Sequence, residues 1–168
     1  RALVDEVTCD EPYVVEPEGG GPPRYRLALY DFGAKANIAR SLAARGARVT
    51  VLPARTRAAD CLALEVDGVV LSNGPGDPEP LVEIIAEVRE LVAAGVPLLG
   101  ICLGHQLLGL ALGGRTFKLK FGHHGGNQPV QDLESGRVLI TSQNHGFAVD
   151  AESLPEGCRA SQVDLNDG

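Results

Sequence analysis

Cys102 lies in the run Leu-Leu-Gly-Ile-Cys-Leu-Gly-His-Gln at residues 98–106, where a buried strand is expected to give way to a helix. Gly100 and Gly104 stand two residues to either side, and small residues there relieve crowding in a sharp strand-to-helix turn. A thiol at a helix start faces the positive end of the helix dipole, which favours the thiolate, and the N–H of Leu103 would point at an oxyanion beside the sulfur. The pattern predicts a nucleophile, although a lone intracellular cysteine is more often a small buried apolar residue.

A second run, Ser-Asn-Gly-Pro-Gly-Asp-Pro at residues 72–78, follows another expected strand. Gly74 and Gly76 would let bare backbone approach a ligand and donate N–H groups to it. Open α/β sheets bind ligands at the carboxyl ends of their strands, so this loop would line one pocket with Cys102. The alternative is an ordinary tight turn.

A polar cluster, Ser-Gln-Asn-His-Gly-Phe, occupies residues 142–147. His145 could be a general base or an ordinary structural hydrogen bonder, while Asn144 and the backbone around Gly146 and Phe147 could recognise a polar substrate. His123 and His124 are adjacent, and adjacent side chains diverge in an extended chain, so no metal site is expected.

Alternating strands and helices are expected to position these residues. The predicted strands are 26–30, 48–52, 66–71 and 96–101, and the predicted helices are 36–45, 58–64, 81–94 and 107–112. The alternation predicts an α/β fold with an open, mostly parallel sheet, mixed at its edge, with helices on both faces and a nucleophile elbow at Cys102. Four further short strands would extend or edge this sheet, at 116–121, 129–133, 137–142 and 146–149.

The composition excludes several classes of function. A net charge of −7 gives no reason to expect nucleic acid or an anionic membrane as a partner. No apolar run approaches the roughly 20 residues of a membrane span. The four cysteines are scattered without C-x-x-C spacing, which is typical of a reducing cytoplasm.

The ends of the chain have their own character. Residues 1–24 are rich in proline, glycine and acids, and are expected to form a linker or extended lead-in from a further, N-terminal domain. The chain begins at Arg1, contains no methionine and stops in a turn-like Asn-Asp-Gly, so we expect truncation at both ends.

Together, the motifs resemble those of the class I (triad-type) glutamine amidotransferases, through residues 100–106 and 72–78. Within that family the chain looks most like the small, glutamine-hydrolysing subunit of carbamoyl phosphate synthetase. Three further runs carry this closer resemblance: Tyr-Asp-Phe-Gly-Ala-Lys at 30–35, Lys-Phe-Gly-His-His-Gly-Gly-Asn at 120–127 and Ser-Gln-Asn-His-Gly-Phe-Ala-Val-Asp at 142–150. The resemblance covers residues 25–168, which would form the amidotransferase domain without its C-terminal part.

The resemblance implies that Cys102 attacks the side-chain amide of L-glutamine and forms a glutamyl thioester, with release of ammonia. It also implies a set of residues that contact glutamine or its oxyanion: Gly74, Gly76, Leu103, Gln106, Asn144, Gly146 and Phe147. The ammonia would pass to a large carbamoyl phosphate synthetase subunit, in a heterodimer or higher oligomer. ATP and metal would be used by that subunit, and this chain would hold no cofactor.

One departure from the family pattern affects the expected activity. The family's catalytic His and Glu come from a His-Pro-Glu motif, which these 168 residues do not contain. His105, His123, His124 and His145 do not match its position, so the 168 residues alone are expected to be nearly inactive. The alternatives are the amidotransferase of another synthase, such as one serving anthranilate or GMP synthesis, and a non-catalytic docking module of the same fold.

Overall fold

The computed structural model describes residues 2–166, which divide into two compact units between Ala111 and Leu112. We call the part before this boundary unit 1 and the part after it unit 2, and describe each by itself. No helix in the described part of the chain is long and apolar enough to cross a membrane. Within residues 2–166, no group of three or more His, Cys, Asp or Glu side chains is placed to hold a metal ion.

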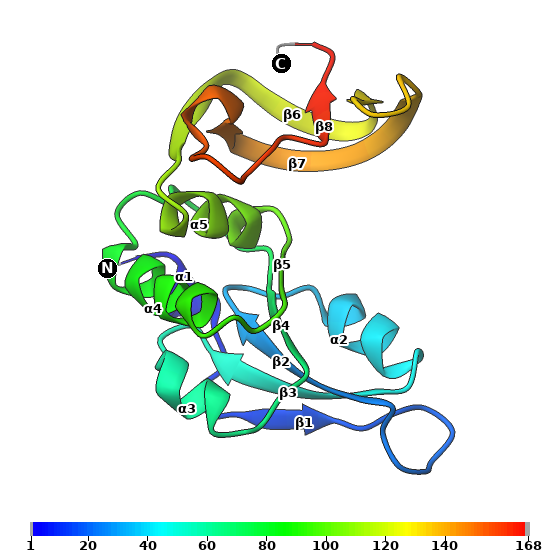
Figure 1. Ribbon diagram of the computed structural model, residues 1–168. Helices are drawn as coiled ribbons and strands as arrows, with labels where there is room; N and C mark the ends of the chain where they lie inside the picture. Colours follow the sequence, from blue (N-terminus) through cyan, green and yellow to red (C-terminus); the bar gives the residue numbers. More distant parts are fainter. Residues whose placement is uncertain (1, 167–168) are drawn as a thin grey trace. The chain divides into compact units, whose positions relative to one another are not determined.

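Unit 1 contains a five-stranded sheet in the order β1-β3-β2-β4-β5 (Figure 1). Its strands are β1 (Tyr13–Val15), β2 (Tyr25–Asp31), β3 (Ala47–Pro53), β4 (Gly68–Leu71) and β5 (Leu98–Gly100). Strands β3, β2, β4 and β5 run parallel, whereas β1 pairs antiparallel with β3 and makes one edge mixed. This arrangement confirms the predicted open, mostly parallel sheet.

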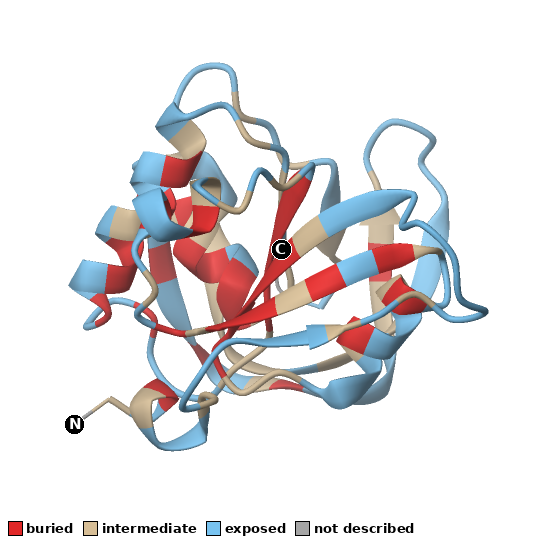
Figure 2. Cartoon of the chain, turned by 90° about the horizontal axis from the view of Figure 1, so that it is seen from below, coloured by how far each residue is buried: buried red, intermediate tan, exposed pale blue. Residues whose placement is uncertain are grey.

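The helices of unit 1 are α1 (Val4–Val7), α2 (Ala36–Ala43), α3 (Ala58–Leu62), α4 (Val82–Ala93) and α5 (Leu103–Ala111). Helices α3, α4 and α5 cover one face of the sheet, and α2 covers the opposite face (Figure 1). Neighbouring strand residues point to opposite faces, so Tyr30 packs with the first group of helices and Leu29 packs on the side of α2. Strand β4 is buried along its whole length and β2 is buried over its last four residues, as expected for a sheet covered on both sides, whereas buried and more exposed residues are mixed in β3 (Figure 2).

Part of the lead-in expected at residues 1–24 has regular structure, because α1 and β1 both lie within it. Strand β1 is part of the sheet, with Tyr13 opposite Val51, and the side chain of Val4 in α1 is 1% exposed. The proline and glycine residues that suggested a linker are concentrated in the turn before β2, where Gly19, Gly20 and Gly21 all have positive φ. Composition averaged over the whole segment therefore hid a short strand.

The strands of unit 2 are arranged differently from the four short strands expected between residues 116 and 149. Residues 116–149 do not extend the main sheet; they form two long antiparallel strands of a separate three-stranded sheet in the order β7-β6-β8. These strands are β6 (Arg115–Asp132), β7 (Val138–Asp150) and β8 (Gln162–Asp164), with the 3-10 turn η1 (Ala151–Ser153) after β7. Gly122 and Gly125 have φ of +71° and +118° beside the register shifts in β6, so the strand bends at bulges where the sequence suggested turns.

Candidate functional site

Cys102 lies between strand β5 and helix α5, and its backbone has a φ of +53°. A left-handed conformation at a residue with a side chain is strained, and such strain is typical of functional sites. Cys102 is half-buried, and its carbonyl oxygen accepts a hydrogen bond from the Gln106 N–H at 3.1 Å. The structure thus confirms the predicted sharp corner and starts the helix at Leu103, four residues before the start that the apolar run 107–112 suggested.

Two glycines allow this corner to form. A methyl group on Gly100 would lie 2.6 Å from the carbonyl oxygen of Gly104, and one on Gly104 would lie 2.2 Å from the carbonyl oxygen of Leu71. Both distances are far below van der Waals contact, so only glycine fits at either place. The Gly104 N–H also donates to the Ser72 carbonyl oxygen at 3.0 Å, which ties α5 to the end of β4.

Leu103 is the first residue of α5, so its N–H has no acceptor within the helix. Its side chain is 1% exposed and lies against Gly74, where a methyl group would be 2.7 Å from the Leu103 Cδ2 atom. The residue that carries one candidate oxyanion donor, Leu103, therefore packs through its side chain against the other candidate element, the Gly74–Gly76 turn. Gln106, three residues further along α5, is 5% exposed.

Loop 72–76 is held by its own side chains. Ser72 is fully buried, and its hydroxyl accepts the Phe32 N–H at 2.9 Å and donates to the Asn73 carbonyl oxygen at 2.8 Å. Asn73 accepts the Lys35 N–H at 3.0 Å and donates to the Gly33 carbonyl oxygen at 2.9 Å. Ser72 and Asn73 were not expected as scaffold residues, although short polar side chains that bond nearby backbone are a recognisable signal in a turn.

A cavity of about 500 Å³ opens beside this loop. Its lining includes Leu3, Arg55, Pro75, Gly76 and Glu83, and Cys102 does not line it. The predicted pocket shared by the loop and Cys102 therefore does not coincide with this cavity. The N-terminal segment borders the cavity instead. Arg55, which also lines it, forms ion pairs with Asp5 and Glu83.

The remaining predicted site residues, Asn144, Gly146 and Phe147, lie on β7 in unit 2. Asn144 is exposed, and its Oδ1 atom is 2.7 Å from the His124 Nδ1 atom on the paired strand β6. Gly146 and Phe147 are half-buried. A methyl group on Gly146 would meet no described atom within 4 Å, so the space beside this residue is open.

His145 is held in a hydrogen-bonded cluster. Its Nδ1 atom is 2.7 Å from the Phe147 carbonyl oxygen, and its Nε2 atom is 2.7 Å from the Gln143 Oε1 atom. Gln143 also contacts the His123 Nδ1 atom at 2.9 Å and donates to the Asp164 carboxylate at 3.0 Å. These contacts favour a structural role for His145 over a role as general base, because both of its ring nitrogens are engaged and one of them orients the Phe147 carbonyl.

Two further thiols, those of Cys9 and Cys61, have raised pKa values. Cys61 is fully buried, and burial raises the pKa of its thiol. Burial also raises the pKa of Cys9, and the neighbouring Asp31 carboxylate adds to that shift. All four cysteines carry thiols rather than disulfides. A raised pKa lowers the thiolate fraction at neutral pH, so neither Cys9 nor Cys61 has the environment of a nucleophile.

Comparison with known proteins finds relatives that match most of this chain. The carbamoyl phosphate synthase small chain of Polynucleobacter asymbioticus is 60% identical over 146 residues, which cover 87% of this chain and 37% of that protein. The protein of the same name from Neisseria meningitidis serogroup B is 52% identical over 179 aligned residues, which cover 99% of this chain and 47% of that protein. The chain therefore spans less than half the length of these curated relatives.

The fold has solved counterparts as well. A glutamine amido transferase from Methylobacillus flagellatus superposes with a TM-score of 0.63 at 19% identity, covering 85% of this chain and 62% of that one. A likeness at this identity concerns the fold alone. Residues 28–168 match the domain family described as glutamine amidotransferase class-I. Because this match covers most of the chain, the protein belongs to the class-I glutamine amidotransferase family.

Proposed function

We propose that this chain is the glutamine-hydrolysing part of a carbamoyl phosphate synthase small chain, with Cys102 as its nucleophile. The observation that carries the proposal is the strained backbone of Cys102 at the start of α5, with φ of +53°, directly before the buried Leu103 that contacts Gly74. This arrangement supports the proposal because the thiol is followed directly by the Leu103 N–H, and the Leu103 side chain packs against the glycine loop that would supply the second donor. The identity to curated carbamoyl phosphate synthase small chains supports the choice of reaction.

In the proposed reaction, the Cys102 thiolate attacks the side-chain carbonyl carbon of L-glutamine. The oxygen becomes an oxyanion, which accepts hydrogen bonds from the Leu103 N–H and from the Gly74–Gly76 turn. The C–N bond then breaks, and the nitrogen leaves as ammonia after gaining a proton. Water attacks the resulting glutamyl thioester, which releases glutamate and restores the thiol.

Other residues of the proposed site would bind the substrate without bonding to it covalently. Gln106 on α5 and Asn144, Gly146 and Phe147 on β7 would contact glutamine. The open space beside Gly146 and the exposure of Asn144 support this role. None of the described histidines is assigned as the general base, because the sequence contains no His-Pro-Glu motif.

The proposal extends to partners and cellular role. A large, ATP-using subunit would take the ammonia and convert bicarbonate to carbamoyl phosphate, for arginine and pyrimidine biosynthesis in the cytoplasm. ATP and its metal would bind to that subunit, and we propose no cofactor for this chain.

The test is transfer of labelled nitrogen in the full-length enzyme together with its large subunit. Amide-¹⁵N glutamine should yield ¹⁵N carbamoyl phosphate with ATP and bicarbonate, and Cys102→Ala should abolish this transfer while leaving synthesis from free ammonia intact. The 168 residues alone are expected to hydrolyse glutamine negligibly. Loss of both the glutamine-driven and the ammonia-driven reactions in Cys102→Ala would contradict the proposed role of the thiol.

A glutamine-mimicking electrophile separates this proposal from its rivals. Selective labelling of Cys102, suppressed by glutamine, is expected for any amidotransferase of this class, whereas an inert Cys102 would favour a docking module. Labelling without carbamoyl phosphate formation would point to the amidotransferase of another synthase. Cys61 provides an internal control, since burial and its raised pKa should leave it unlabelled.

A further inference from the structure

Asp31, the last residue of β2, has a buried carboxylate that bonds backbone on two sides. It is 8% exposed. Its Oδ1 atom accepts the N–H groups of Gly33 at 2.9 Å and Ala34 at 2.7 Å. Its Oδ2 atom accepts the N–H of Cys9, in the N-terminal segment, at 2.9 Å. The carboxylate therefore holds the turn that follows β2 and fastens the N-terminal segment to that turn.

The turn held by Asp31 lies against the Gly74 backbone. A methyl group on Gly74 would be 2.3 Å from the Phe32 carbonyl oxygen and 2.9 Å from the Phe32 Cβ atom. On its other side, the same methyl group would meet Leu103. Gly74 is thus held between Phe32 and the first residue of α5, and a shift of Phe32 would move it.

Hydrogen bonds join the same two segments. The Ser72 hydroxyl accepts the Phe32 N–H, and the Asn73 side chain bonds Gly33 and Lys35. The glycine loop after β4 therefore takes its position from the turn after β2. Asp31 is the side chain that fixes that turn from within, because only an acceptor with two free oxygens can serve all three N–H groups.

We propose that Asp31 is a positioning residue for glutamine hydrolysis, which sets the oxyanion-binding backbone at Gly74 through the Phe32 turn. The proposal rests on the proposed function. The Asp31 carboxylate takes no part in the chemistry itself, because its oxygens are engaged with the backbone. Its effect on the reaction passes through the placement of the loop, where a displacement of about 1 Å can cost about a hundredfold in rate.

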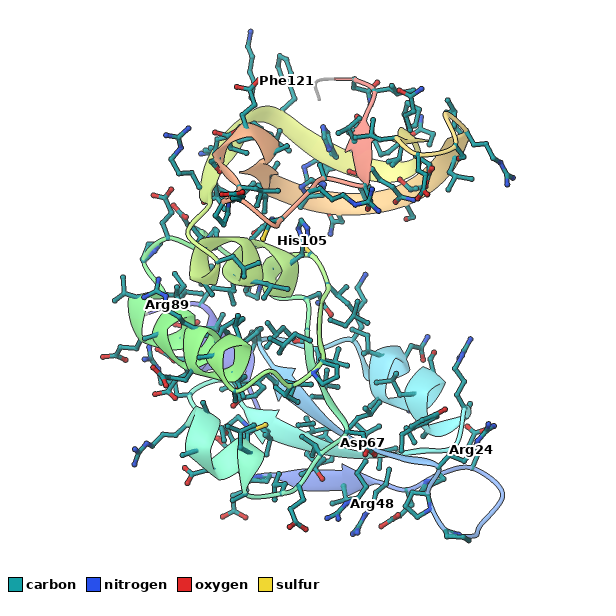
Figure 3. All side chains as sticks on the ribbon, in the orientation of Figure 1. Arg24, Arg48, Asp67, Arg89, His105 and Phe121 are labelled. Atoms are coloured by element: carbon teal, nitrogen blue, oxygen red, sulfur yellow. The ribbon has the colours of Figure 1, made fainter. Side chains whose placement is uncertain are left out.

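The test compares Asp31→Ala and Asp31→Asn with Asp67→Asn in the full-length enzyme. Asp67 is a control of the same residue type at an exposed position, where its Oδ2 atom accepts one backbone N–H, from Arg26 at 2.7 Å, near the opposite end of β2 (Figure 3). Asp31→Asn keeps the side-chain volume and one acceptor oxygen, which can still accept the N–H groups of Gly33 and Ala34. Its NH2 group would face the Cys9 N–H, which is also a donor, so that hydrogen bond is lost. This variant should be intermediate between wild type and Asp31→Ala.

Three measurements separate positioning from a merely structural role. Asp31→Ala should lower kcat for glutamine hydrolysis about tenfold to a hundredfold and change KM by less than about threefold, because oxyanion contacts act in the transition state. The affinity for an aldehyde analogue of glutamine, which forms a tetrahedral thiol adduct, should fall in parallel with kcat. Alkylation of Cys102 by iodoacetamide, which forms no oxyanion, should stay within about twofold of wild type.

Several outcomes would overturn the proposal. These are an unchanged kcat in Asp31→Ala, an equal loss in Asp67→Asn, and a loss of iodoacetamide reactivity that matches the loss of kcat. If Asp31→Ala does not fold, Asp31→Asn decides by the same criteria. If the wild-type enzyme does not hydrolyse glutamine, the proposed function fails separately, and amide hydrogen exchange then decides the positioning role: peptides covering 72–78 must exchange faster in Asp31→Asn than in Asp67→Asn.

Discussion

A methyl group at Gly104 would lie 2.2 Å from the carbonyl oxygen of Leu71, so the first turn of α5 packs against the end of β4 with no room for a side chain at position 104. Leu71 also accepts the Ile101 N–H at 2.9 Å, one residue before Cys102. The neighbouring strand therefore determines where the cysteine corner lies.

Gly104→Ala should destabilise the protein by about 1–3 kcal/mol, because the added methyl group must displace backbone atoms rather than a flexible side chain. Urea denaturation measures this change in the free energy of unfolding. Gly126→Ala is the control, since a methyl group on Gly126 meets no described atom within 4 Å. Equal midpoints for Gly104→Ala and wild type would contradict the close packing of α5 on β4.

Replacing Cys102 by glycine and by alanine should measure the backbone strain at the corner. Both variants lose the thiol, so neither should hydrolyse glutamine. Glycine adopts the observed φ of +53° without penalty, whereas alanine keeps a Cβ atom in the left-handed region. Cys102→Gly should therefore be about 1 kcal/mol more stable than Cys102→Ala. A more stable alanine variant would show that the corner relaxes when the sulfur is removed.

Gly146→Ala should affect glutamine binding without affecting folding. The methyl group would enter open space, so the unfolding midpoint should match that of wild type. In the proposed site it would occupy room that glutamine needs, which should raise KM about tenfold, equivalent to about 1.4 kcal/mol of binding free energy. An unchanged KM would remove Gly146 from the proposed glutamine site.

Acid should weaken the turn after β6. The Ser135 backbone N–H, 2.8 Å from Asp132 Oδ1, holds the pKa of Asp132 below its ordinary value, and the Ser135 hydroxyl assists at 2.7 Å. A carboxyl group with a lowered folded pKa adds stability above its unfolded pKa, and this contribution is lost as the pH falls through the folded pKa. Carbon-detected NMR titration should find the Asp132 pKa closer to its ordinary value in Ser135→Ala. Because this variant keeps the Ser135 backbone N–H, an identical titration in the two proteins would contradict only the contribution assigned to the hydroxyl.

Short-range patterns were enough to predict most of unit 1. A short, continuous apolar run predicts strand β4, and apolar residues at helical spacing predict helix α4. The structure places the ends of both elements within two residues of the prediction. The apolar run 107–112 predicts a later start for the helix after Cys102 than the structure shows, and Gly104 and His105 are weak helix formers. Packing of Gly104 against Leu71 outweighs that weakness, and no local pattern records such a contact.

Unit 2 and the N-terminal segment were predicted less well. Gly122 and Gly125 indicated turns, yet they sit at bulges inside one continuous strand. Whether a glycine ends a strand or bends it depends on whether a partner strand continues to pair beyond it, and β7 does so on both sides. Likewise, β1 is too short to be recognised until β3 lies beside it.

The sequence by itself determined the chemistry that this chain can offer: a cysteine between two glycines, a glycine loop after a neighbouring strand and a polar run at 142–147. Residue types and spacing suffice for this because a nucleophile and its backbone donors are local features of one or two turns. The tertiary structure decided the φ of Cys102, the contact of Gly74 with Phe32 and Leu103, and the hydrogen bond from the Cys9 N–H to the Asp31 carboxylate. These depend on close packing between segments that lie tens of residues apart, and only the folded chain brings them together.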